Sequence, residues 1–243
     1  LLSRCATDVH SDSASQGRFL EDSGVCTPGR IQIFGSGSIS GVNIRKFSTQ
    51  PGRRQRVRAS LGIKEDSIVF MFLGRMQRDK GLLILADAFA QILEKKGDAI
   101  LLLVGPDEEQ LTSFIKDRFV GKCHWIGLTP APEDYLDAAD VLCLPSFREG
   151  FGTVIIEAAA MGIPAVASRI YGLTDAVIDG ETGLLCSPGN AVDLANAMEK
   201  LMDPSERERL GKNARTRAHQ DFPAEKVTAY WREYYRLRLE PLV

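Results

Sequence analysis

Apolar and polar positions alternate in blocks along this chain, and from residue 67 onward the blocks repeat in a regular order. Short apolar runs, typical of buried strands, are separated by longer segments in which apolar residues recur every three to four positions, typical of amphipathic helices. The predicted strands are 67–73, 98–104, 123–126, 140–144 and 164–168. The predicted helices are 81–95, 108–119, a short one after Pro132, 153–161, one from Pro204 to about 220, and about 224–239. Regular alternation of this kind predicts an α/β fold with a doubly wound parallel sheet.

The segment after the predicted strand 140–144 has the features of a ligand site. Two carboxylates, Glu149 and Glu157, flank the turn Gly150-Phe151-Gly152. Its glycines allow a ligand to approach the backbone, and Thr153 is predicted to be the N-cap of a helix whose first amides face an anion. Because open α/β sheets bind ligands at the carboxyl ends of their strands, we interpret this segment as a site for a phosphate with neighbouring sugar hydroxyls. The alternative is an ordinary turn beside two solvated glutamates.

A second candidate site follows the predicted strand 67–73. Its loop carries Arg75, Arg78 and Lys80 just before the next helix. Arg75 can bind phosphate oxygens bidentately and Lys80 adds a compact charge, so the pair suits a diphosphate and can offset the charge on a leaving nucleoside diphosphate. Arg78 is predicted to be a solvated neighbour. The sequence has no Asp-x-Asp pair and no His/Asp cluster with ligand spacing, so we predict neither a metal nor a cofactor.

Composition narrows the classes of protein that the chain can belong to. It has 243 residues and a formal net charge of −2, which gives no electrostatic reason to expect a nucleic-acid partner. No apolar run in the sequence is long enough to span a membrane, and no segment has the pattern of a signal peptide, so we expect neither. The five cysteines form no CxxC pair, as expected for reduced thiols. We therefore expect a cytoplasmic protein whose membrane association, if any, is peripheral and at the inner face.

Four blocks in the same order resemble the C-terminal, donor-binding domain of the retaining GT-B glycosyltransferases of family 4, also called group 1. The blocks are FLGRMQRDKG at 72–81, LLVGPDEE at 102–109, DVLCLPS at 140–146 together with the Glu149–Glu157 pair, and DGETGLL at 179–185. The pair matches the carboxylate-x7-carboxylate motif of that family. The resemblance covers about residues 5–240 and implies a Rossmann-like sheet that forms the C-terminal half of a GT-B fold.

The resemblance implies that a sugar is transferred, with retention, from a UDP-sugar or GDP-sugar to a hydroxyl acceptor without a metal. It assigns catalytic roles to Arg75 and Lys80, which would bind the diphosphate, and to Glu149, which would bind sugar hydroxyls. Glu157 would hold the ribose. The other implied donor-binding residues are Gly74, Gly105, Ile126, Gly150, Phe151, Gly152 and Thr153. The implied acceptor is a lipid-linked saccharide in bacterial O-antigen or capsule assembly. Two alternatives stay open: a non-catalytic nucleotide-sugar-binding subunit of a split transferase, and an epimerase, for which we find no additional acid/base residues.

The same resemblance divides the chain into three parts. Residues 1–40 correspond to the end of an N-terminal acceptor domain and the crossing between domains, and 41–222 to the donor-binding domain. Residues 223–243 form a helix that either crosses back to the acceptor domain or packs on its own domain. Because most of the acceptor domain would be missing, we expect the chain alone to bind donor without transferring sugar.

Three further segments invite a functional interpretation. The run Gly35–Gly41 is predicted to be a flexible linker in the cleft, since its spacing is one residue away from a dinucleotide-binding fingerprint. The basic run Arg53–Arg58 is predicted to be the solvated face of a short helix rather than a contact for lipid headgroups. His124 is expected in the core or the cleft wall, and no histidine is assigned to catalysis.

Overall fold

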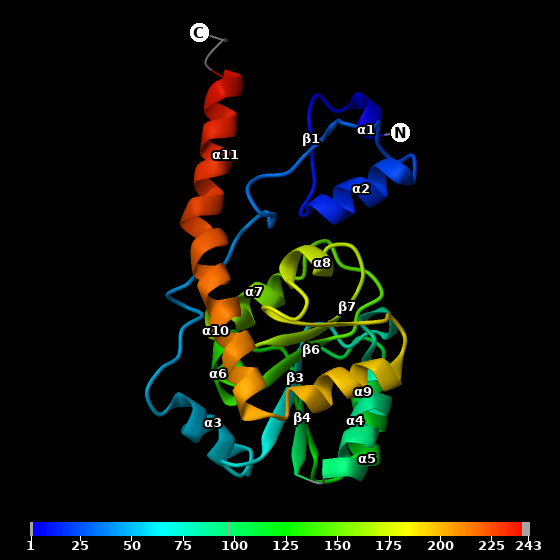
Figure 1. Cartoon of the computed structure of the whole chain (residues 1–243), viewed down its shortest axis with the longest axis vertical. Coiled ribbons are helices and arrows are strands. Elements are labelled where there is room, and N and C mark those ends of the chain that lie inside the picture. Colours follow the sequence, from blue (N-terminus) through cyan, green and yellow to red (C-terminus); the bar gives the residue numbers. More distant parts are fainter. Residues whose placement is uncertain (1, 97, 240–243) are drawn as a thin grey trace.

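The computed structural model describes residues 2–96 and 98–239, and among these a six-stranded, all-parallel sheet forms the main body (Figure 1). Its strands are β3 (Ile68–Leu73), β4 (Ala99–Val104), β5 (Cys123–Ile126), β6 (Val141–Leu144), β7 (Ala165–Ser168) and β8 (Gly183–Cys186). Its helices are α3 (Arg53–Ser60), the 3-10 helix η1 (Arg78–Lys80), α4 (Leu82–Lys96), α5 (Leu111–Arg118), α6 (Pro132–Ala138), α7 (Thr153–Ala160), α8 (Leu173–Ala176), α9 (Ala191–Lys200) and α10 (Pro204–Asp221). The predicted doubly wound α/β class is thereby confirmed.

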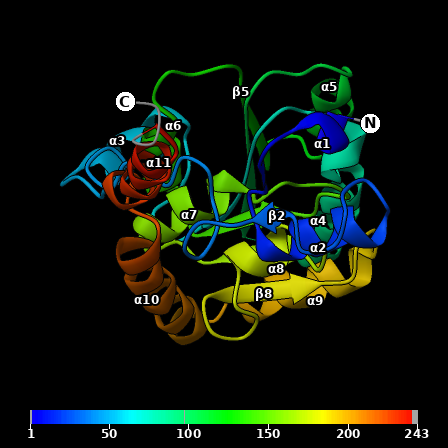
Figure 2. The same cartoon turned by 90° about the horizontal axis from the view of Figure 1, so that it is seen from above.

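The strand order places two loops at the centre of the sheet. The order is β5-β4-β3-β6-β7-β8, so the chain winds outward in one direction from β3 and in the other from β6. Helix α4 packs against α9 on one face of the sheet, and α7 packs against α10 on the other (Figures 1 and 2). Both faces are covered, so the central strands are apolar along their whole length, as in β4, where every residue is buried. The loops after β3 and β6 lie at the switch point, where such sheets bind ligands.

Some elements were not anticipated. Strand β8 occupies part of the DGETGLL block, and α9 follows it, capped by Asn190, whose side chain accepts hydrogen bonds from the amides of Val192 and Asp193. The cap and the apolar spacing of α9 are local features, so this helix is predictable from the sequence. His124 is half-buried in β5 and lines neither of the cavities described below.

The prediction that the basic run of α3 is a solvated face is wrong for two of its arginines, Arg53 and Arg58, which are buried and so face neither solvent nor a lipid surface. Arg58 is only 1% exposed, and its guanidinium lies 2.7 Å from Asp140 Oδ2. Arg53 is also buried, with Nε 2.6 Å from Asp137 Oδ2. The carboxylates that neutralise these side chains lie about 80 positions further along the chain. No local pattern reveals them.

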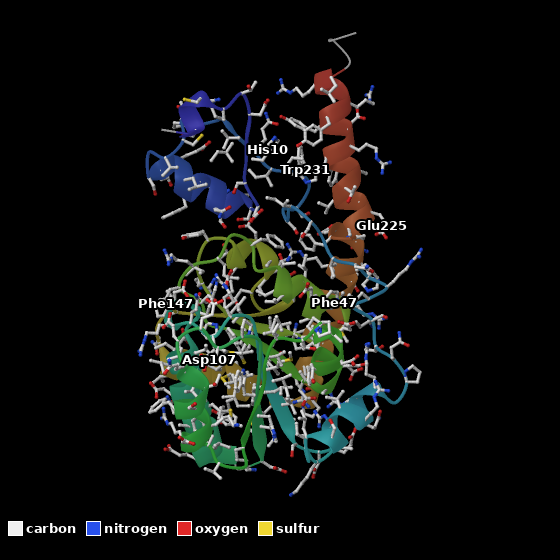
Figure 3. The ribbon with its side chains drawn as sticks, turned by 180° about the vertical axis from the view of Figure 1, so that it is seen from behind. His10, Phe47, Asp107, Phe147, Glu225 and Trp231 are labelled. Atoms are coloured by element: carbon white, nitrogen blue, oxygen red, sulfur yellow. The ribbon has the colours of Figure 1, made fainter. Side chains whose placement is uncertain are left out.

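A small N-terminal unit, residues 2–32, lies above the carboxyl edge of the main sheet (Figures 1 and 2). It contains α1 (Leu2–Cys5), β1 (Val9–His10), α2 (Ala14–Asp22) and β2 (Ile31–Gln32), with β1 and β2 paired in parallel. The last helix, α11 (Ala224–Leu239), projects past the main body and runs beside this unit. The aromatic stripe of α11, formed by Tyr230, Trp231 and Tyr234, faces residues 10–34: the ring centroid of Trp231 lies 5.1 Å from that of His10 (Figure 3). The end of the predicted 223–243 segment, residues 240–243, lies outside the described residues.

The run Gly35–Gly41 packs against both the N-terminal unit and α11. The amide of Ser38 donates to the carbonyl of Asp12 at 2.7 Å, and the indole of Trp231 donates to the carbonyl of Ile39 at 3.0 Å. The next helix after Gly41 is α3, which begins at Arg53, so the segment has no dinucleotide-binding geometry.

Across the described ranges, none of the helices combines the length and the apolar character needed to span a bilayer.

Candidate functional site

The two loops singled out in the sequence meet at the switch point between β3 and β6. The loop after β3 carries Arg75 and Lys80, and the loop after β6 carries Glu149. A backbone hydrogen bond of 2.8 Å from the amide of Phe147 to the carbonyl of Asp79 joins them. Residues about 70 positions apart in the sequence are thus held against each other at the carboxyl edge of the sheet.

Two glycines permit this close approach. A Cβ atom on Gly81, whose φ is +73°, would lie 2.1 Å from the carbonyl oxygen of Pro145. On Gly105, whose φ is +133°, it would lie 2.0 Å from the carbonyl oxygen of Gly74. Any side chain at these positions would push apart the loops that form the site.

The first cavity at this edge, which we call the anion cavity, has a volume of about 240 Å³. It is lined by Phe72, Leu73, Gly74, Arg75, Lys80, Leu144, Glu149, Gly152, Thr153 and Val154. Two cations and the start of α7 therefore border one space, and both favour a negatively charged ligand.

The start of α7 differs in one respect from the prediction. The N-cap is Gly152, with φ +80°, and Thr153 is the first helical residue, so the prediction of Thr153 as N-cap is wrong. A glycine cap offers no side-chain acceptor, and within the described chain the amides of Phe151, Gly152 and Thr153 donate to no carbonyl or side chain. The side chain of Phe151 is buried against Phe222, with ring centroids 5.3 Å apart, so only its backbone can reach a ligand.

Lys80 and Glu149 form an ion pair, a contact that the sequence did not reveal. Lys80 Nζ lies 2.9 Å from Glu149 Oε1, and the two side chains are 16% and 17% exposed. Ser146, which is fully buried, donates from Oγ to the same Oε1 at 2.9 Å. Ser146 was not predicted as a site residue, although its place just after a buried strand was a usable signal.

Arg75 and Arg78 are more exposed. Arg75 is 57% exposed, and its Nη1 lies 3.5 Å from Glu108 Oε2. Arg78 is 68% exposed and pairs with Glu109 at 3.5 Å, which confirms its predicted exposure. Arg78 lines neither of the two cavities at this edge, whereas Arg75 lines both.

The second cavity, which we call the apolar cavity, has a volume of about 420 Å³ and adjoins the first. It is lined by Leu73, Gly74, Arg75, Val104, Gly105, Pro106, Leu128, Thr129, Pro132, Val154 and Glu157. Leu73, Gly74, Arg75 and Val154 are shared, so the two cavities lie on either side of one wall. Ile126, a predicted donor-binding residue, lines neither cavity; its carbonyl accepts a hydrogen bond at 2.9 Å from the amide of Gly105, which lines the apolar cavity. Leu128, Thr129, Pro132 and Val154 also line this cavity and were not predicted as site residues. They come from the loop after β5 and from the first turns of α6 and α7, so no single local pattern groups them.

Glu157 places one carboxylate at the edge of the apolar cavity. Burial raises its pKa to about 7, with Lys46 lowering the pKa and Glu133 raising it further. Among the described residues, no group donates a hydrogen bond to this carboxylate. A ligand that brings hydroxyl donors would satisfy it.

The combined geometry suits an elongated ligand with an anionic and an apolar part. The cations and free amides can hold phosphates, and the apolar cavity can hold a flat ring. The two glutamates can accept hydrogen bonds from hydroxyl groups. Within residues 2–96 and 98–239, no group of three or more His, Cys, Asp or Glu side chains is placed to hold a metal ion.

Comparison with known proteins gives consistent matches. A family described as "Glycosyl transferases group 1" matches residues 53–217. The capsular polysaccharide biosynthesis glycosyltransferase CapM of Staphylococcus aureus is 29% identical over 241 residues, which cover 94% of this chain and 60% of CapM. Sucrose-phosphate synthase from Thermosynechococcus elongatus superposes with a TM-score of 0.84 and 31% identity over 97% of this chain and 59% of that protein. Anabaena HepE in complex with UDP-glucose superposes with a TM-score of 0.84 and 26% identity, over 96% of this chain and 65% of HepE. The chain thus spans about three fifths of the length of these proteins.

Proposed function

Because this chain belongs to the group 1 glycosyl transferases and has the fold of the C-terminal half of a GT-B enzyme, we propose that its paired cavities bind a nucleoside diphosphate sugar as donor. The sugar would pass, with retention, to a hydroxyl group of an acceptor. The same site residues that the sequence singled out would hold the donor.

Two chemically different cavities meet at Gly74, and this arrangement is the main support for the proposal. The anion cavity contributes Arg75, Lys80 and the amides at the start of α7, a set that suits a diphosphate. The apolar cavity suits a nucleobase, with Glu157 at the place where a ribose would present its hydroxyls. HepE, which has the same fold and 26% identity, binds UDP-glucose, and this supports a donor of that class.

Each residue has a defined role in the proposed reaction. Arg75 and Lys80 bind the diphosphate and offset the negative charge that grows on it as the sugar leaves. Glu149 accepts hydrogen bonds from the sugar hydroxyls, and Glu157 from the ribose. The acceptor hydroxyl attacks the anomeric carbon from the face that the diphosphate leaves, and a phosphate oxygen takes its proton. This sequence of events retains the anomeric configuration without a protein nucleophile.

The acceptor is proposed from the relatives. CapM is a capsular polysaccharide biosynthesis enzyme, and this supports a role in assembling a surface polysaccharide, with a lipid-linked saccharide at the inner membrane face as acceptor. Because the chain spans about three fifths of these relatives, we propose that residues 1–243 alone bind donor without transferring sugar.

Isothermal titration calorimetry with UDP, GDP, UDP-glucose and GDP-mannose tests donor binding directly. Arg75→Ala and Lys80→Ala should each weaken binding of the diphosphate by about 10- to 150-fold, since a hydrogen bond to a charged group contributes about 1.5–3 kcal/mol. Binding of the bare nucleoside should change little in either variant. Arg78→Ala, outside both cavities, is the matched control and should stay within about twofold of the wild type, since its ion pair is exposed.

Two results would count against the proposal. Failure of the wild-type chain to bind any of the four nucleotides would remove its basis. Unchanged diphosphate affinity in both Arg75→Ala and Lys80→Ala would show that the phosphates bind elsewhere.

A further inference from the structure

The ion pair between Lys80 and Glu149 lies inside the anion cavity itself. Both side chains line the cavity, and Lys80 Nζ is 2.9 Å from Glu149 Oε1. Ser146 donates to the same carboxylate oxygen, and because Ser146 is fully buried, it holds Glu149 in the orientation that faces Lys80. The cation best placed to bind a phosphate is therefore already bound by a carboxylate of the protein.

The other cation of the anion cavity, Arg75, is paired less firmly than Lys80. Arg75 is 57% exposed, and its own carboxylate partner, Glu108, is 39% exposed, so solvent screens that pair. The Lys80–Glu149 pair, with both side chains about one sixth exposed, is screened much less. A diphosphate that takes Lys80 leaves Glu149 partly buried, charged and next to the phosphate. That arrangement is unfavourable, because a carboxylate that loses its partner keeps its desolvation cost.

We propose that Glu149 competes with the diphosphate for Lys80 and thereby selects nucleotide that carries a sugar over nucleotide that does not. When a sugar is attached, its hydroxyl groups donate to Glu149 and replace Lys80, so the carboxylate stays satisfied and the lysine is released to the phosphate. After the sugar has been transferred, Glu149 forms its ion pair with Lys80 again, and the product nucleoside diphosphate is bound less tightly. The inference rests on the proposed function and adds to it a specificity role for the ion pair.

Glu149→Gln tests this competition. The amide oxygen of glutamine can still accept the hydrogen bond from Ser146, and the side chain keeps its shape, so the substitution removes little except the charge. We expect the variant to bind UDP or GDP, whichever the wild type binds, about 3- to 10-fold more tightly, which lies between the effects expected for an exposed and for a fully buried ion pair. Affinity for the matching UDP-glucose or GDP-mannose should not rise. The wild-type preference for sugar nucleotide over diphosphate should therefore shrink or reverse.

Two matched comparisons isolate the route through Lys80. Glu109→Gln removes the same charge from the same edge of the sheet, but Glu109 pairs with Arg78 and lines neither cavity. Its diphosphate affinity should stay within about twofold of the wild type, as for an exposed pair. In a Lys80→Met background, Glu149→Gln should give no gain, because there is no lysine to release.

The outcomes separate the inference from the proposed function. Diphosphate affinity that is unchanged or weaker in Glu149→Gln, while Lys80→Met still weakens it, overturns the inference and leaves the proposed function standing. A gain of equal size in the Lys80→Met background overturns it too, since the effect would then be general charge repulsion. Failure of the wild-type chain to bind any of the nucleotides overturns the proposed function and this inference with it.

Discussion

Glu157 shows how burial sets the chemistry of a single side chain. Its pKa is raised from an ordinary value of 4.5 to about 7 because the carboxylate is buried, with Lys46 opposing the shift and Glu133 adding to it. The folded protein therefore binds this proton more tightly than the unfolded chain does. The stability that the proton contributes is fully present below about pH 4.5 and is lost as the pH rises through 7.

Glu157→Gln should remove this pH dependence, because glutamine does not titrate. As the pH rises from 5 to 8, the wild type should lose up to about 3 kcal/mol of unfolding free energy that the variant does not lose. Urea unfolding of both proteins at the two pH values measures the difference. If the difference between variant and wild type is the same at pH 5 and pH 8, the buried carboxylate does not titrate in this range.

At the scale of elements, α3 shows that a correctly predicted helix can have its faces assigned wrongly. The helix was expected from the sequence, but Arg58 points inward and docks it against the main body. Its guanidinium pairs with Asp140 and also donates to the backbone carbonyls of Lys64, Glu65 and Ser67. One arginine thus joins the helix, the loop after it and the start of β6.

Arg58→Met should destabilise the protein by about 3 kcal/mol or more, because it leaves buried acceptors without a donor. Arg56→Met is the matched control: Arg56 is exposed on the same helix, so its loss should cost less than about 0.5 kcal/mol. Chemical denaturation of the three proteins gives the comparison. Equal losses for the two variants would mean that the ion pair with Asp140 does not dock the helix.

At the scale of the whole molecule, the N-terminal unit depends on segments far along the chain. Its two-stranded sheet is too small to be stable alone. The aromatic stripe of α11 covers it, with His10 and Trp231 in contact (Figure 3). Ser13 Oγ also donates to the carbonyl of Gly150 at 3.0 Å, which ties the unit to the glycine turn of the candidate site.

Trp231→Ala should loosen this unit and leave the main sheet intact, since the indole contacts His10 and Phe34 and donates to Ile39. Hydrogen exchange should show faster exchange at residues 9–34 and unchanged protection in β3 and β4. Arg232→Ala, at the exposed neighbouring position, should leave both regions unchanged. Uniform loss of protection across the main sheet in Trp231→Ala would show that the two parts unfold together.

The class of fold, and the edge of the sheet where the candidate site lies, could be predicted from residue order alone. Strand and helix periods are local properties, so alternating patterns were enough to predict a parallel sheet. In such a sheet the loops after successive strands share one edge, and this was enough to expect Arg75, Lys80, Glu149 and Glu157 near one another. The residue that caps α7 depended on backbone geometry that no local motif specified.

Which charged side chains pair with each other, and which are buried, follows from the folded arrangement of distant segments. Lys80 and Glu149 are 69 positions apart, and Arg58 and Asp140 are 82 apart. The raised pKa of Glu157 and the packing of α11 on residues 9–34 also depend on segments that come together only in the fold. An ion pair or a pKa depends on distance and burial in space, whereas a sequence pattern records only order along the chain.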